Sequence, residues 1–133
     1  MYRFILLLIA IRIGMTSHIN AFLVKSIDEL KNDISARTNT RVDDMNNPCA
    51  IIRLQLPSIG LLDFGNMVVG EVTRRPGEYI LYVSPSAKQL TYSYNNIENT
   101  INFADYDIDI EGKKTYRIIL KDDETYTTSN TSA

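Results

Sequence analysis

The sequence predicts an all-β protein, a small antiparallel β-sandwich of about seven strands. Two observations indicate this class. Apolar and polar residues alternate with period two in several short runs, which is the pattern of a strand with one buried face. Turn signals recur about every ten residues and no segment shows convincing helical periodicity, so we expect the strands to pack as two sheets.

Residues 1–21 have the features of an export signal. A basic residue precedes the apolar run Phe4–Ile11, and Ile19–Ala21 fits a cleavage site. The run is far shorter than the roughly 20 apolar residues that cross a bilayer. We therefore expect an exported chain, periplasmic or associated with the outer membrane, and not an integral membrane protein. Arg12 interrupts the pattern and leaves two alternatives open, a membrane-dipping anchor or a start at Met15.

The length and composition are those of a single globular domain. The chain has 133 residues, of which 44% are hydrophobic and 23% charged. We expect a signal peptide at 1–21, one β-sandwich domain at 22–121 and a flexible polar tail at 122–133. The net charge of −2, without any run of more than two basic residues, argues against nucleic-acid binding.

Catalytic chemistry has little support in the sequence. Cleavage after Ala21 would remove His18, the only histidine, which disfavours Ser–His and Cys–His nucleophiles and most zinc sites. Cys49 has no partner cysteine and begins an apolar run, which favours a buried structural thiol over a reactive one. We expect no catalytic residues, no cofactor and no metal. A small hydrolase with paired carboxylates is the least favoured alternative.

The first part of the expected domain contains two strands separated by a loop. Phe22–Ile27 is a short strand, and the polar segment Asp28–Asp33 is expected to form one helical turn. Arg37–Pro48 is rich in Thr, Asn and Asp and is expected to be a loop. Cys49–Pro57 alternates, with Arg53 and Gln55 on the polar face, so we expect a half-buried strand. The apolar face of that strand consists of Ala50, Ile52, Leu54 and Leu56.

The clearest turn signal is the dipeptide Pro76-Gly77. Proline fixes φ at the second position of a turn and glycine supplies a positive φ at the third, as a type II turn requires. The dipeptide lies between the strand-like runs Met67–Thr73 and Tyr79–Val83. The sequence therefore predicts a β-hairpin at this position.

Three further strands are expected at Gln89–Tyr94, Asn99–Phe103 and Thr115–Lys121. With the earlier runs they make seven, a number typical of prealbumin-like and immunoglobulin-like sandwiches. Alternation shows which side faces the core in three of the later strands, Tyr79–Val83, Gln89–Tyr94 and Thr115–Lys121. Those core-facing residues are Tyr79, Leu81, Val83, Leu90, Tyr92, Tyr94, Tyr116, Ile118 and Leu120.

Asp105, Asp107 and Asp109 form an acidic run with a spacing of two residues. A calcium loop that begins in this way needs glycine at its sixth position and glutamate at its twelfth. Ile110 and Tyr116 occupy those positions, so the calcium motif fails. We interpret the run as a strand or sheet edge whose charged face deters edge-to-edge pairing.

Three residues are predicted to form an interaction surface: Ile80, Tyr82 and Tyr106. Ile80 and Tyr82 lie on the face of their strand opposite to the core-facing residues. Exposed aromatic side chains beside aliphatic ones can mark a recognition surface. The alternative is that a second layer, formed by residues 22–36, covers them.

The stretch from Cys49 to Lys121 contains a set of glycine, turn and strand motifs: Gly65-Asn66, Gly70, Pro76–Tyr79 and Lys113–Leu120. In these motifs it resembles PEGA-like domains, which are small β-sandwich modules of cell-envelope proteins. A Pro-Gly-Glu-Tyr sequence stands here where the family has Pro-Glu-Gly-Ala.

A wider resemblance is to the N-terminal domain of exported Bacteroidetes proteins of unknown function. It rests on Ser35–Asn39, Asn47–Arg53, Gly65–Gly70, Gly77–Tyr79 and Asn102–Tyr106. That group supplies no catalytic residues. With the export signal, the resemblances imply a non-enzymatic interaction or accessory module of the cell envelope that binds a protein partner. The alternative is a glycan-binding module in which exposed tyrosines stack on sugar rings.

Overall fold

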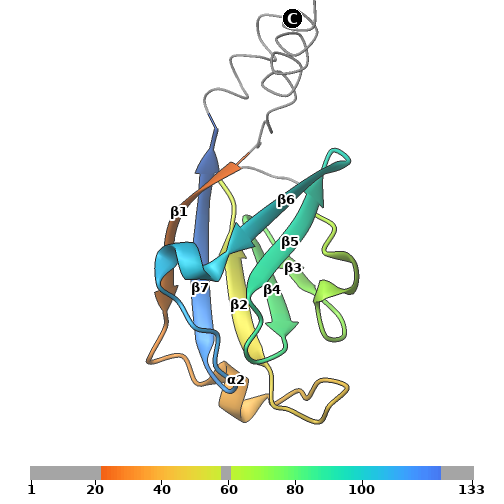
Figure 1. Ribbon diagram of the computed structural model, residues 1–133, viewed down its shortest axis with the longest axis vertical. Coiled ribbons are helices and arrows are strands. Elements are labelled where there is room, and N and C mark those ends of the chain that lie inside the picture. Colours follow the sequence, from red (N-terminus) through yellow and green to blue (C-terminus); the bar gives the residue numbers. More distant parts are fainter. Residues whose placement is uncertain (1–21, 58–60, 124–133) are drawn as a thin grey trace, which may run out of the picture.

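The computed structural model describes residues 22–57 and 61–123, which form two packed β-sheets (Figure 1). The predicted all-β sandwich is confirmed, and the described residues contain seven strands. The expected signal peptide at 1–21 and most of the expected tail at 122–133 lie outside the described residues.

Strands are the main regular structure of the described residues, and the helical elements are single turns. The strands are β1 (Phe22–Glu29), β2 (Ala50–Gln55), β3 (Thr73–Arg75), β4 (Glu78–Val83), β5 (Gln89–Tyr94), β6 (Ile97–Asn102) and β7 (Thr115–Asp122). The helical turns are α2 (Ser35–Thr38) and the 3₁₀ segments η1 (Gly65–Met67) and η2 (Phe103–Tyr106).

The larger sheet has the strand order β1-β7-β2-β4-β3, and β5 and β6 form a two-stranded sheet in front of it (Figure 1). All neighbours are antiparallel except β2 and β7, which run parallel. The larger sheet is therefore mixed. Alternation along a strand says which face is buried but not which strand lies beside it, so the parallel pair was not visible in the sequence.

The core lies between the two sheets. The alternating faces predicted for β2, β4, β5 and β7 all point into it, and full burial of each aliphatic side chain contributes roughly 1.5–3 kcal/mol. Leu56 and Tyr94 are the partly exposed members of the predicted set, and the ring centre of Tyr94 lies 5.1 Å from that of Phe22. The residues with 0% exposure are Ala50, Ile52, Leu54, Leu81, Val83, Leu90 and Ile118.

β1 is longer than the sequence predicted. The expected helical turn at Asp28–Asp33 is wrong, because Asp28 and Glu29 continue β1 and pair with Arg117 and Tyr116 of β7. These ladder contacts outweigh the weak local preference of a polar segment. The single helical turn of this region is α2, which comes later.

The predicted hairpin at Pro76-Gly77 is present, with Arg75 paired to Glu78 across a two-residue turn. Gly77 has a φ of +74°, as the third position of a type II turn requires. The first strand of the hairpin is much shorter than Met67–Thr73, because β3 begins only at its last residue.

Arg41 explains why the chain before β3 is not a strand. Its guanidinium donates hydrogen bonds to the carbonyl oxygens of Val69 and Glu71, at 2.6 and 3.0 Å. Between them Gly70 has a φ of +75°, and a β-carbon there would lie 2.9 Å from Arg41 Nη1. A side chain from a distant loop thus takes the backbone acceptors that a longer strand would have used.

The acidic run does not form the expected strand or edge. Asp105 lies in η2, and Asp107 follows with a φ of +55°, which ends the 3₁₀ turn. The loop after it is held by Tyr116, whose hydroxyl donates to the carbonyl of Asp109 at 3.0 Å. The same hydroxyl accepts a bond from the backbone N–H of Glu111 at 2.9 Å. Tertiary contacts to the backbone therefore decide the path of this segment.

Candidate functional site

A groove of about 310 Å³ lies on the face of the larger sheet that points away from β5 and β6. We call it the outer-face groove. It contains two of the three predicted interaction residues, Ile80 and Tyr82, because both point outward from β4. The full lining is Asp33, Ser35, Asn39, Arg41, Ile51, Arg53, Thr73, Arg75, Ile80 and Tyr82.

Tyr82 is fixed by the loop that follows α2. Its hydroxyl donates to the carbonyl of Asn39 at 2.7 Å. The guanidinium carbon of Arg41 lies 4.0 Å from the centre of its ring, a cation–π contact worth about 0.5–1 kcal/mol at a partly exposed site. Tyr82 is half-buried as a result. Its position is therefore determined by contacts within the chain.

Arg53 organises the charged side of the groove. It forms a two-pronged pair with Glu78, from Nε to Oε2 and from Nη2 to Oε1, both at 3.0 Å. Its third nitrogen lies 3.5 Å from Oδ2 of Asp33. The hydrogen bond with Glu78 raises the pKa of Arg53. Hydrogen bonds from Ser35, first from its side chain, lower the pKa of Asp33 below its ordinary value.

Arg75 differs from the other arginines of the groove. It is exposed, and within residues 22–57 and 61–123 it forms no ion pair. Arg41 and Arg53, in contrast, are held by carbonyls and carboxylates. The groove therefore presents one uncommitted cation beside Ile80 and Tyr82.

The alternative of a covering second layer is partly right. The residues that cross the outer face are Asp33 to Arg41, whereas Phe22–Glu29 form β1 within the sheet itself. This crossing segment covers one side of Tyr82 and forms one wall of the groove. The sequence contained no signal for that path, because it depends on the contact between Arg41 and Tyr82.

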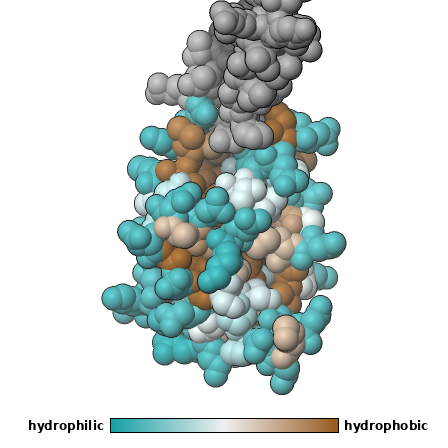
Figure 2. All heavy atoms as spheres, viewed as in Figure 1, coloured by the Kyte–Doolittle hydropathy of each residue, from teal (hydrophilic) through white to brown (hydrophobic). Residues whose placement is uncertain are grey.

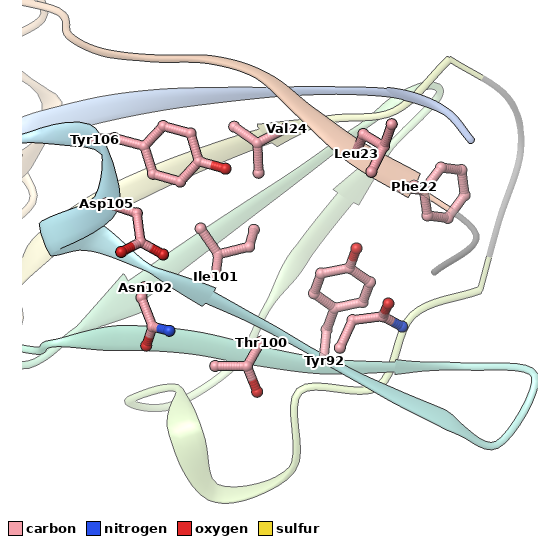
Figure 3. Close-up of a pocket in the computed structure, with 10 residues that line it drawn as sticks. Phe22, Leu23, Val24, Tyr92, Thr100, Ile101, Asn102, Asp105 and Tyr106 are labelled. Atoms are coloured by element: carbon pink, nitrogen blue, oxygen red, sulfur yellow. The ribbon is translucent and has the colours of Figure 1, made fainter. Parts of the chain in front are cut away.

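Tyr106 lies on a different surface. It is 40% exposed on η2 and lines a pocket of about 110 Å³ beside β1 and β6, which we call the β1–β6 pocket. Figure 3 shows Tyr106, Val24 and Leu23 on one side of this pocket and Ile101 and Thr100 on the other. The three predicted residues therefore do not form one surface.

Asn99 is a residue of this pocket that the sequence reasoning missed. It is only 5% exposed, and its amide nitrogen donates to the carbonyl of Ile97 at 3.1 Å. Its amide oxygen is buried and has no hydrogen-bond partner in the described part of the chain. The signal was present, since Asn99 shares the inward side of its strand with Ile101 and Phe103.

The described residues contain no group of three or more His, Cys, Asp and Glu side chains that could hold a metal ion. Cys49 is 1% exposed, and burial raises the pKa of its thiol, as expected for a structural cysteine. Among residues 22–57 and 61–123, no helix has the length and apolar character that a membrane crossing requires.

Comparisons with protein-family models, with curated proteins and with solved structures find no match for the chain. The resemblance to PEGA-like modules therefore stays a prediction from sequence motifs. The outer-face groove and the β1–β6 pocket are the two candidate binding sites.

Proposed function

We propose that this chain is an exported, non-enzymatic interaction module of the cell envelope that binds a protein partner through the outer-face groove. The observation that carries the proposal is the composition of the groove. Ile80, Tyr82 and Arg75 lie together in one concave surface. Tyrosine and arginine are the residue types that supply much of the binding energy at protein interfaces.

The rigidity of the groove supports a binding role. Asn39 and Arg41 hold Tyr82, and Arg53 is held by Glu78 from the neighbouring strand. Side chains that are already ordered lose little conformational entropy when a partner binds. A partner would therefore meet a surface whose shape is set before contact.

The state of the carboxylates favours binding over hydrolysis. Asp33 and Glu78 both face Arg53, so each is engaged in an ion pair. Hydrolysis by paired carboxylates needs one group that stays protonated near neutral pH. Such a group needs a raised pKa, whereas the pKa of Asp33 is lowered.

The export signal expected at residues 1–21 is the basis for the proposed location. We propose that the mature chain is periplasmic or associated with the outer membrane. Mass spectrometry of the N-terminus of the mature chain tests whether cleavage follows Ala21.

Glycan binding has less support than protein binding. Sugar rings stack on open aromatic faces, and Arg41 lies over the ring of Tyr82. Tyr106 lines the other pocket, so the two tyrosines do not form a joint platform. A glycan array tests this alternative, and hits that Tyr106→Ala abolishes would favour it.

Quantitative co-purification from envelope extracts tests the proposed function. Arg75→Glu changes the uncommitted cation of the groove, and Lys121→Glu makes the same charge change at the exposed end of β7. We expect recovery of a specific partner to fall about tenfold with Arg75→Glu, which corresponds to about 1.4 kcal/mol, and to stay unchanged with Lys121→Glu. A chain that remains unassociated, or equal losses in both variants, would contradict the proposal.

A further inference from the structure

The outer strand of the small sheet has a free edge. Among residues 22–57 and 61–123, β6 pairs only with β5, and a two-residue turn at Asn95-Asn96 joins them, with Tyr94 opposite Ile97. In such a hairpin alternate residues bond to the partner strand, and the residues between them direct their backbone N–H and C=O groups outward. The outward residues of β6 are Glu98, Thr100 and Asn102.

The same rule can be checked on β5. It places Ser93 outward, and its N–H and C=O do bond to Asp63 outside the hairpin, at 2.7 and 3.0 Å. On β6 no strand of the described chain takes the corresponding position. The three outward residues of β6 are also exposed to solvent. An extended segment can therefore add to this edge.

The β1–β6 pocket lies next to this edge and holds an unmet hydrogen-bond acceptor. Asn99 is only 5% exposed, and its Oδ1 has no hydrogen-bond partner among the described residues. Buried polar atoms normally have partners, so an unpaired one in a pocket indicates a missing donor. A volume of about 110 Å³ suits one small side chain, and a Ser or Thr hydroxyl would supply the donor.

The rim of the pocket indicates the charge of the ligand. Asp105 lines it, is exposed, and forms no ion pair within the described residues. Leu23 and Tyr106 add apolar area, each at 40% exposure (Figure 3). On the face seen in Figure 2 hydrophobic residues appear between hydrophilic ones rather than as one broad patch. A narrow site with both polar and apolar residues is better suited to binding an extended peptide than to binding the flat surface of a folded protein.

From these observations we propose that the free edge of β6 and the β1–β6 pocket bind an extended peptide segment of a partner protein by strand addition. A Ser or Thr side chain of the peptide donates to Oδ1 of Asn99, and a Lys or Arg side chain pairs with Asp105. The site lies where β6 of the small sheet faces β1 of the larger sheet, and it shares no lining residue with the outer-face groove. It does not depend on the function proposed for that groove.

Peptide titration followed by amide NMR tests the inference on the chain as expressed and processed by cells. The probe is the blocked peptide Lys-Val-Thr-Val-Thr-Val-Lys, whose Lys and Thr side chains share one face of a strand. We expect saturable shifts at the backbone amides of Thr100 and Asn102. Replacing both Thr by Ala, or both Lys by Glu, should weaken binding about tenfold, the usual effect of losing one such interaction.

Two variants separate binding from folding. Asn99→Leu removes the acceptor while filling the same space, so the fold should persist and peptide affinity should fall about tenfold. Thr100→Pro removes an outward N–H, which an edge strand tolerates, and should abolish strand addition. Arg74→Pro makes the matching change on the edge strand β3 and should leave peptide binding unchanged.

Several results would overturn the inference. These are the absence of shifts with the folded chain, shifts confined to the outer-face groove, or unchanged affinity in folded Asn99→Leu. Shifts at Thr100 that depend on protein concentration without peptide would assign the edge to a second copy instead. Protection of the Thr100 amide that is lost when residues 124–133 are deleted would assign it to the chain's own C-terminal segment.

Discussion

In the outer-face groove the aromatic ring and two of the three arginines are held by partners within the chain. The β1–β6 pocket, in contrast, buries an amide oxygen that has no partner among the described residues. Arg53 illustrates the first case with its two bonds to Glu78, and Asn99 illustrates the second. Polar contacts in the groove set its shape. The unpaired oxygen in the pocket leaves hydrogen-bonding capacity for a ligand, at a cost in stability of about 1–3 kcal/mol.

The largest expected effect concerns whether both surfaces belong to one folding unit. Leu81 in β4 and Leu90 in β5 are both 0% exposed in the shared core. We expect Leu81→Ala and Leu90→Ala each to lower the free energy of unfolding by about 3 kcal/mol. Urea denaturation measures both. A cost below about 1 kcal/mol for Leu90→Ala alone would mean that the small sheet is not part of the cooperative core.

The next largest effect is a loss of stability at alkaline pH, caused by Tyr92 in the small sheet. Burial raises the pKa of Tyr92 from 10.0 to about 12. The unfolded tyrosine therefore loses its proton before the folded one, so stability falls as pH rises through this window, by up to about 3 kcal/mol. Absorbance of the phenolate and unfolding at each pH measure it. If Tyr92→Phe has the same slope between pH 10 and 12 as the original chain, Tyr92 is not the group responsible.

A smaller effect is expected in the groove from Glu78→Gln. This change keeps the shape of the side chain but removes the charge that faces Arg53, whose side chain is 32% exposed. We expect a loss of about 1–2 kcal/mol in the free energy of unfolding, because hydrogen bonds to charged groups are stronger than neutral ones.

Glu111→Gln is the matched control for this change. It removes an exposed ion pair with Lys114 and should cost less than about 0.5 kcal/mol. Equal costs in thermal unfolding would show that the pair with Glu78 gives the groove no special rigidity. The contrast between the groove and the pocket would then lose its physical basis.

The smallest effect is expected at acid pH. The folded pKa of Asp33 is lowered, first by the side chain of Ser35, so its contribution to stability is present above the unfolded value of 3.8. That contribution is lost as pH falls through the folded pKa. Asp33→Asn should therefore show a weaker loss of stability in acid than the original chain. Identical acid unfolding curves would exclude a role for Asp33 in fixing Arg53.

The sequence predicted the inward faces of the strands well because alternation is a local property. Ile52, Leu81 and Ile118 were placed in the core from their spacing alone. It predicted the strand before Pro76 poorly, because Arg41 takes the carbonyls of Val69 and Glu71 from a distance of more than twenty residues along the chain. No local pattern reports such a contact.

In the candidate surfaces too, local spacing predicted some features and tertiary contacts decided the others. Ile80 and Tyr82 were expected together because they are two residues apart on one strand, and they share a groove. Tyr106 was grouped with them by residue type, but it follows β6 in the other layer. Alternation places Asn99 on the inward side of its strand, but its unpaired oxygen is visible only in the structure.

Spacing and turn chemistry were enough to establish the all-β class, the buried faces and the hairpin at Pro76-Gly77, since each depends on residues a few positions apart. The parallel pairing of β2 with β7, the crossing of the outer face by Asp33 to Arg41, and the pocket between β1 and β6 were decided only when distant strands came together. Strand order and side-chain burial depend on contacts between residues far apart in the chain, and these contacts leave no local pattern in the sequence.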